Sequence, residues 1–115
     1  MNKITSSLFL TLILISNAYA VSEDQLESIR QLGDLNGVAL KCHYLKEARK
    51  IKLSLAASLP KERGLGEMFE DETNRSFLDF INNNKICPGE AGFHNRVQQE
   101  IERLKKRSTS VETLK

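Results

Sequence analysis

Apolar residues recur every three or four positions along most of this chain, and no segment alternates apolar and polar residues as a half-buried strand does. The pattern therefore predicts a helical protein. A first helix is expected after Ser22, because Gln25 three positions later completes a capping box. The apolar stripe of this helix is made of Ile29, Leu32, Leu35, Ala39 and Cys42.

A second helix is expected from Leu45 to Leu59, where it stops before Pro60 because proline disfavours helical geometry in the preceding residue. Lys52 falls inside the apolar stripe of this helix on a helical wheel. Such a lysine extends to solvent, pairs with a carboxylate, or shows that the helical phase is wrong. The other stripe residues are Tyr44, Ala48, Ile51, Leu55 and Leu59.

A third helix is predicted from about Lys61 or Glu62 to Ile81, before a run of three asparagines. Its apolar face holds three of the five phenylalanines of the chain, so we expect it to be the central element of the core. The face is made of Leu65, Met68, Phe69, Thr73, Phe77 and Phe80.

A turn at residues 87–89 opens a fourth helix, expected from about Glu90 to Lys106. Its stripe would face either the core or a partner. It contains Phe93, Val97, Ile101 and Leu104. Residues 108–115 are expected to form a flexible C-terminal tail.

These elements predict an all-α fold, a small bundle of about four helices, in a single domain over residues 21–107. Gly33 and Gly37 lie one turn apart in the first helix. They indicate either a close approach by another helix or a bend. Their surroundings are polar, so they do not indicate dimerisation in a membrane.

The first twenty residues have the layout of a cleavable signal peptide. Lys3 precedes an eight-residue run, Leu8 to Ile15, that is apolar apart from one threonine, and Ala18 and Ala20 supply the small side chains of a cleavage site. The run covers only about 12 Å as a helix, against a hydrocarbon core of about 30 Å. We therefore expect cleavage before Val21, a periplasmic or secreted location, and no stable membrane insertion afterwards.

The chain has two cysteines, Cys42 and Cys87, and an oxidising compartment favours a structural disulfide between them. By the chain-entropy model, closing this loop stabilises the fold by about 4 kcal/mol. Three alternatives are a redox pair, a metal site that also uses His43 and His94, and an intermolecular disulfide. The redox pair lacks CxxC spacing, and the metal site lacks the paired spacing that zinc ligands show.

The formal net charge is only +2, which gives no reason to expect a nucleic-acid partner. The charges are nevertheless segregated along the chain. Residues 41–63 hold seven basic and two acidic side chains, residues 64–84 hold one and five, and residues 85–107 hold six and three. This alternation is typical of neighbouring helices with complementary solvated faces, and a basic surface for an anionic partner or lipid is the other interpretation.

No catalytic or cofactor motif is present in the sequence, and we predict neither an active site nor a cofactor. Glu67, Glu70 and Asp71 share one helix face, but that face is expected to be solvated, whereas paired catalytic carboxylates need different environments. His94 has no partner that the sequence reveals. Glu72 and Asp79 are candidate ion-pair partners for Lys52 or Arg75.

The last predicted helix and the cysteine layout resemble the HdeA-type periplasmic acid-stress chaperones. The similarity lies in about twenty residues plus the cysteine spacing, with the helix positions Phe93, Val97, Ile101, Leu104, Lys105 and Lys106. The resemblance implies a client-binding chaperone that loosens at low pH and exposes apolar surface. Protonation of Glu67, Glu70 and Asp71 offers a physical route to that loosening, since it would remove attractions between helices.

The sequence therefore leads us to expect an exported protein that acts by non-enzymatic binding of a protein partner, as an adaptor, inhibitor or immunity-type binder. The acid chaperone is the alternative. A small enzyme or metal-binding protein that uses His43, His94 and the acidic stretch is a third hypothesis.

Overall fold

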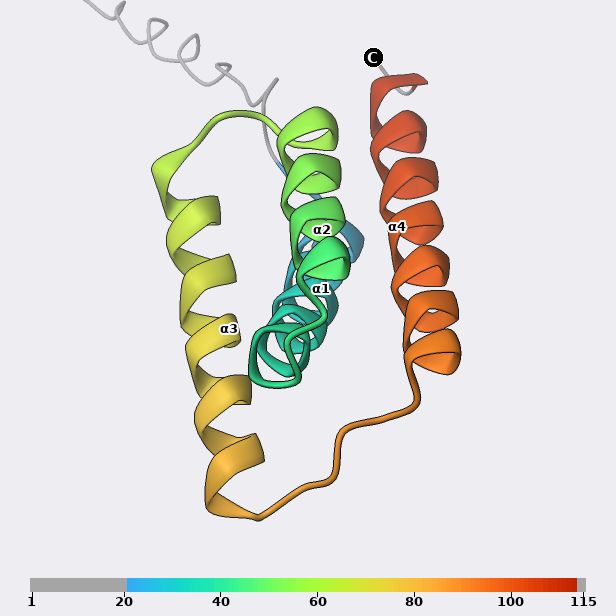
Figure 1. Cartoon of the computed structure of the whole chain (residues 1–115). Coiled ribbons are helices and arrows are strands. Elements are labelled where there is room, and N and C mark those ends of the chain that lie inside the picture. Colours follow the sequence, from blue (N-terminus) through green and yellow to red (C-terminus); the bar gives the residue numbers. More distant parts are fainter. Residues whose placement is uncertain (1–20, 114–115) are drawn as a thin grey trace, which may run out of the picture.

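The computed structural model describes residues 21–113, and within this range it contains four helices and no strand. They are α1 (Glu23–Lys41), α2 (Leu45–Ser58), α3 (Arg63–Asn82) and α4 (Glu90–Thr113) (Figure 1). This confirms the predicted all-α bundle. The predicted signal peptide and the residues after Thr113 lie outside the described range.

Helix boundaries lie close to the predicted ones at three of the four elements. Ser22 and Gln25 form the predicted capping box, with Gln25 N donating to Ser22 Oγ at 3.0 Å and Ser22 N to Gln25 Oε1 at 2.9 Å. α2 ends at Ser58, two residues before Pro60. α3 begins at Arg63, one residue after the later of the two predicted starts.

The prediction for the end of α4 is wrong, because the helix continues through Thr113 and residues 108–113 are helical. Its last turns contact the first turns of α1. Arg107 donates to the carbonyl of Asp24 at 3.0 Å and to Ser28 Oγ at 2.7 Å, and Gln25 Nε2 donates to Ser108 Oγ at 3.3 Å. These polar contacts across helices extend α4 beyond the end of its apolar stripe, which is why the stripe alone predicted a shorter helix.

α1 is the central helix, since it packs against each of the other three, whereas α3 packs against α1 alone. The prediction that α3 is the central element is therefore wrong. Of its three phenylalanines, Phe69 and Phe80 are buried but Phe77 is only half-buried. The number of aromatic residues in α3 indicated an apolar face, but it did not indicate how many neighbours would cover that face.

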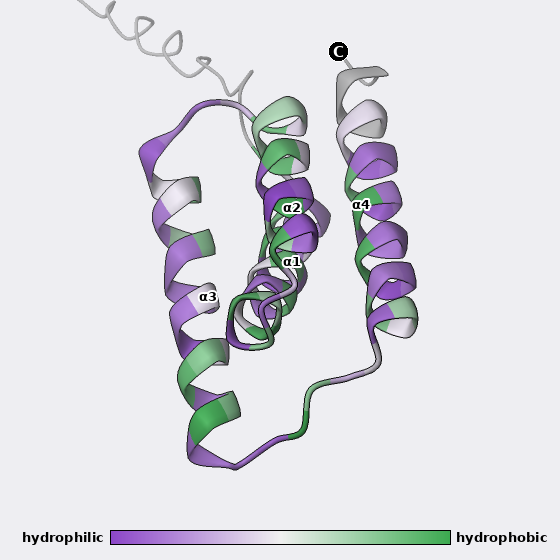
Figure 2. Ribbon diagram, viewed as in Figure 1, coloured by the Kyte–Doolittle hydropathy of each residue, from purple (hydrophilic) through white to green (hydrophobic). Residues whose placement is uncertain are grey.

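The main core lies where α1, α2 and α4 meet, and its largest side chains are fully buried. Apolar residues line the inner sides of these helices while their outer sides are polar (Figure 2). Burial of each large apolar side chain stabilises the fold by about 1.5–3 kcal/mol before entropy is counted. The fully buried apolar residues are Ile29, Leu32, Leu35, Ala39, Ile51, Phe93, Val97, Ile101 and Leu104.

α1 and α3 make a different kind of contact, through small and polar residues. A Cβ atom added to Gly37 would lie 2.6 Å from both the Thr73 carbonyl oxygen and Ser76 Cβ, and one added to Gly33 would lie 2.7 Å from Glu72 Cβ. The two glycines therefore permit a close helix approach, the first of the two predicted interpretations. At this crossing Ser76 Oγ donates to the Asp34 carbonyl at 2.7 Å, and Asn36 Nδ2 donates to Thr73 Oγ1 at 3.2 Å.

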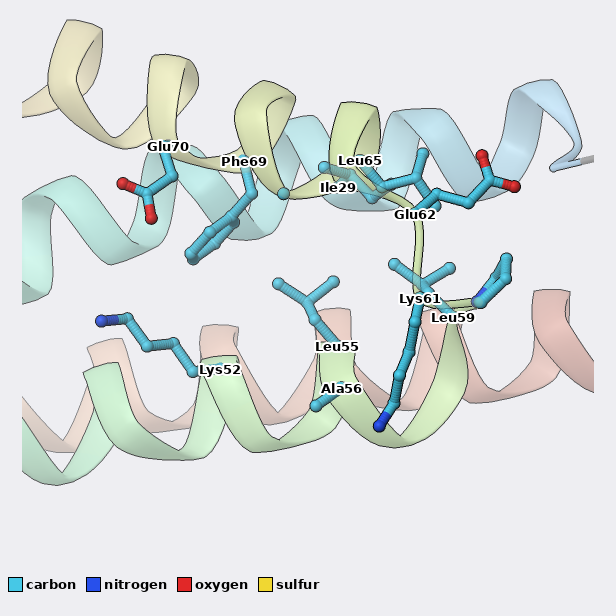
Figure 3. A pocket seen from close by; sticks show the side chains of 12 residues that line it. Ile29, Lys52, Leu55, Ala56, Leu59, Lys61, Glu62, Leu65, Phe69 and Glu70 are labelled. Atoms are coloured by element: carbon cyan, nitrogen blue, oxygen red, sulfur yellow. The ribbon is translucent and has the colours of Figure 1, made fainter.

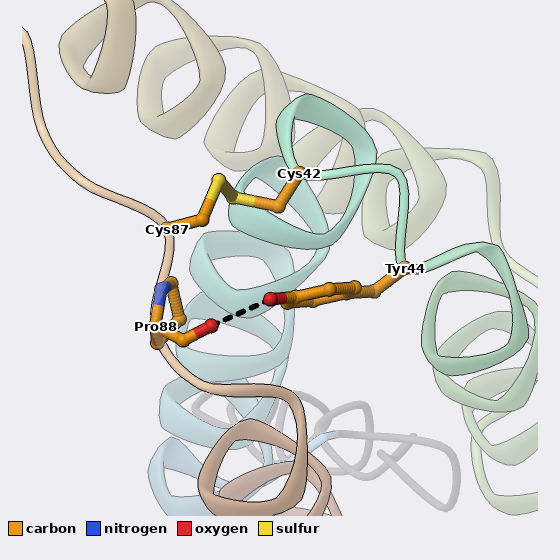
Figure 4. The surroundings of a disulfide bond; sticks show 4 residues. All are labelled: Cys42, Tyr44, Cys87 and Pro88. Atoms are coloured by element: carbon orange, nitrogen blue, oxygen red, sulfur yellow. Dashed lines mark hydrogen bonds between the residues drawn. A yellow bond between two sulfur atoms is a disulfide. The ribbon is translucent and has the colours of Figure 1, made fainter.

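The predicted disulfide joins Cys42 at the end of α1 to Cys87 in the loop before α4, with the two Cα atoms 5.8 Å apart (Figure 4). Beside it, the Tyr44 hydroxyl donates to the Pro88 carbonyl at 2.6 Å, and its ring lies 5.4 Å from that of Phe93. His43 turns the chain between α1 and α2 with φ of 63°, the left-handed region. These contacts bring the start of α4 to the α1–α2 corner.

Candidate functional site

An apolar groove runs between α2 and α3, and α1 forms its floor (Figure 3). α2 and α3 do not pack against each other, so the space between them is open at the surface. The groove has a volume of about 320 Å³. It is lined by the apolar residues Ile29, Leu55, Ala56, Leu59, Pro60, Leu65 and Phe69, by Gly66, and by four charged residues described below.

The apolar walls come from the two helices on either side of Pro60. Leu55 and Leu59 lie one turn apart at the end of α2, and Leu65 and Phe69 lie one turn apart at the start of α3. Leu59 and Leu65 are half-buried, as expected for side chains that pack against the core on one side only. At 1.5 Å per residue, the apolar part of each wall extends about 6 Å, or roughly one helical turn.

Four charged side chains surround the groove: Lys52 on α2, Lys61 and Glu62 in the α2–α3 linker, and Glu70 on α3. All four are exposed, and none forms an ion pair with another residue of the described chain. Of the three outcomes predicted for Lys52, the structure shows extension to solvent. Its stem follows the apolar wall and its ammonium group reaches solvent at the end of the groove (Figure 3).

The predicted acidic face is solvated. Glu67, Glu70 and Asp71 are exposed, and the ion pair that Glu67 forms is with Arg63 of the same helix. Their protonation would therefore not remove attractions between helices, and the proposed route to acid loosening through these three residues is wrong. The ion pair that joins α3 to α1 is instead Arg75–Asp34, at 3.7 Å.

The charge segregation is not explained by pairing between α2 and α3. Within residues 21–113, the ion pairs of α3 are formed inside the helix, with α1, or with the following loop. Glu72 accepts from Arg75 at 2.8 Å and raises the pKa of that guanidinium. A hydrogen bond of 2.7 Å from Lys85 is the main cause that lowers the pKa of Asp79.

A buried carboxylate links α2 to α4, and sequence reasoning did not identify it. Glu47 is 7 % exposed, and its Oε2 lies 2.8 Å from Nδ1 of His94. The Lys50 ammonium lies 3.4 Å from the same ring nitrogen. Lys50 lies 3.6 Å from the other carboxylate oxygen. The sequence signal that could have identified this carboxylate was the position of Glu47 next to Ala48, on the inner face of α2.

Glu47 could orient His94 as a general base. A catalytic site also needs a nucleophile or hydrogen-bond donors that bind the substrate. The metal-site hypothesis is not supported by the placement of its members. Cys42 and Cys87 are joined in the disulfide, His43 is exposed at the α1–α2 corner, and the ring of His94 contacts Glu47. No group of three or more potential metal ligands occurs in the described part of the chain.

Comparison with known protein families, curated proteins and solved structures finds no match to this chain. Among residues 21–113, no helix combines the length and apolar character needed to cross a bilayer. The groove and the Glu47–His94 contact are therefore interpreted from their own geometry.

Proposed function

We propose that this protein is an exported, non-enzymatic binder that receives an apolar helix of a partner protein in the groove between α2 and α3. The observation that carries the proposal is an apolar groove that no described element of the chain covers. Pockets lined mainly by apolar side chains with a few charged groups are the usual binding sites of proteins.

The packing of α4 on the other side of α2 is an argument for a helical occupant of the open groove. There α4 packs against both α1 and α2 and buries Phe93, Val97, Ile101 and Leu104. A helix with an apolar stripe is thus the element that this chain itself uses to cover an α1–α2 surface. The uncovered groove has apolar walls of about one turn, a length that suits apolar residues of a helix at spacings of three and four.

Site-specific photo-crosslinking tests the proposal. A photoreactive amino acid replaces Ala56, which is exposed in the groove, or Glu102, which is exposed on α4, and both variants are expressed in the exporting cell. We expect one dominant adduct from position 56 that is missing from position 102. The adduct is mapped to a segment, and a synthetic peptide of that segment is expected to bind the purified protein.

Binding of that peptide is then measured with Leu59→Asp, which places a charge in the groove wall, and with Leu53→Asp, an exposed α2 position outside the groove lining. We expect Leu59→Asp alone to abolish binding. Equal adducts from positions 56 and 102, or equal binding by the two aspartate variants, would contradict the proposal.

Acid-triggered client binding is the second candidate, and the attachment of α3 supports it. α3 packs against α1 alone, and its ionic contacts outside its own helix are Arg75–Asp34 and Lys85–Asp79. Loss of the Arg75–Asp34 contact would weaken the attachment of α3 to α1, and displacement of α3 would uncover Phe69 and Phe80. Aggregation of a test client at about pH 2–3, with and without the protein, tests this function, and no protection would exclude it.

A further inference from the structure

We infer that the groove selects a helix whose apolar stripe has acidic side chains along one flank and basic side chains along the other. This inference rests on the proposed function and adds the chemistry of the partner. It follows from the arrangement of the four charged residues around the groove, which places one lysine and one glutamate at each end.

At one end Lys52 projects from the α2 wall and Glu70 from the α3 wall (Figure 3). At the other end Lys61 extends towards α2, whereas Glu62 points away from α2, towards the side of α3 and α1 (Figure 3). The positive groups thus lie along the α2 side and the negative groups along the opposite side, which α3 and α1 form (Figure 3). A helix in the groove would have one flank beside each row.

The exposed surfaces of the two helices continue this separation. Arg49 is exposed on α2, and Asp71 is exposed on α3, and neither forms an ion pair within residues 21–113. The occupant would therefore meet fields of opposite sign on its two flanks, and complementary flanks favour specific association over competing partners.

Occupants of one charge sign fit this arrangement less well. A helix with two acidic flanks is attracted by Lys52 and Lys61 but repelled by Glu62 and Glu70, and a helix with two basic flanks meets the reverse. Like-charge contacts across an interface are a source of specificity as strong as the favourable pairs.

The test uses three synthetic helical peptides with an identical leucine stripe and different flanks: glutamate on one side and lysine on the other, glutamate on both, or lysine on both. Their affinities for the mature, disulfide-bonded protein are measured by fluorescence anisotropy. We expect the mixed peptide to bind about ten-fold more tightly than either of the others at low salt, a ratio that reflects several exposed pairs. The ratio should fall towards one as salt screens the flanks.

Lys52→Glu makes one end of the groove negative on both walls. Lys106→Glu, at an exposed position of α4, is the matched control. We expect Lys52→Glu to remove most of the preference for the mixed peptide over the lysine peptide, and Lys106→Glu to leave it unchanged. Both positions are exposed, so both variants are expected to fold, and unfolding curves verify this.

The outcomes separate this inference from the proposed function. Equal binding of all three peptides, abolished by Leu59→Asp, would overturn the charge selection and leave the helix-binding groove in place. No binding of any peptide would overturn both. Tighter binding of dodecanoate than of every peptide would make the groove a lipid site, and a dimer that Leu59→Asp dissociates would make it an interface between copies. Either result would also overturn both.

Discussion

The two sides of α1 are packed by different means. Towards α2 and α4 the helix buries large apolar side chains, and the disulfide and the Tyr44–Pro88 hydrogen bond fix the corner where these helices meet. Towards α3 it presents Gly33 and Gly37, and backbone, hydroxyl and amide groups meet there at short range, beside the buried ring of Phe69.

The difference shows how a small helical protein can hold a helix in a defined place and still leave apolar surface uncovered. Close packing at two glycines positions α3 against α1 without any contact with α2. The apolar residues at the start of α3 therefore remain at the edge of the core, where they line the groove. The predictions below test whether the two sides differ in energy as they do in structure.

The largest effect is expected from Phe93→Ala, which empties a fully buried site between α4 and the rest of the core. We expect a loss of about 3–5 kcal/mol in the free energy of unfolding, measured by urea denaturation. The same truncation at half-buried Phe77 of α3 serves as the matched control and should cost clearly less. Equal losses would show that α3 contributes as much to the core as α4.

Removal of the disulfide by Cys42→Ser with Cys87→Ser should cost about 2–4 kcal/mol, because the bridge closes a loop with a sequence separation of 45 residues. That loop contains α2 and α3. Since α3 has one helix neighbour and α2 has two, we expect the backbone amides of α3 to lose most hydrogen-exchange protection. Uniform loss of protection over all four helices would contradict the distinction between the two sides.

Gly37→Ala should destabilise the protein by about 1–3 kcal/mol, since the added methyl group overlaps Thr73 and Ser76 and moves α3 away from α1. Gly92→Ala makes the identical change in α4, where a Cβ meets nothing within 4 Å. The control should be neutral or stabilising by up to about 1 kcal/mol, as alanine is the better helix former. Thermal unfolding compares the two, and a neutral Gly37→Ala would show that the crossing is loose.

The smallest effect is expected on the acid dependence of stability. The pKa of Asp79 is lowered in the folded protein, mainly by the hydrogen bond from Lys85. A lowered carboxyl pKa stabilises the fold above the unfolded-state pKa, and this stabilisation is lost as the pH falls through the folded-state pKa. Lys85→Gln should therefore make the acid side of the pH–stability curve shallower.

Lys106→Gln removes an exposed lysine of α4 that forms no ion pair within the described chain and should leave the acid limb unchanged. Urea midpoints measured from neutral pH down to the acid transition provide the comparison. A parallel shift of both variants would assign the effect to net charge and not to the contact with Asp79.

Much of the fold was predictable because its signals are local. The capping box at Ser22, the stop before Pro60 and the stripe from Phe93 to Leu104 each depend on residues within a few positions of one another. The disulfide was predictable because a chain with two cysteines has one intramolecular pairing. The groove and the Glu47–His94 contact were missed, since each brings together segments that no spacing rule relates.

The sequence by itself determined four amphipathic helices and a disulfide, because helical periodicity, capping and cysteine number are properties of short segments or of composition. Tertiary structure decided which helix is central, how far α4 extends, and which apolar residues stay uncovered. The physical reason is that the apolar stripe of a helix indicates how much surface the helix must bury. Which other helices cover that surface depends on the packing of the whole chain. Two glycines let α3 approach α1 closely, and the groove lies where α2 and α3 do not pack against each other.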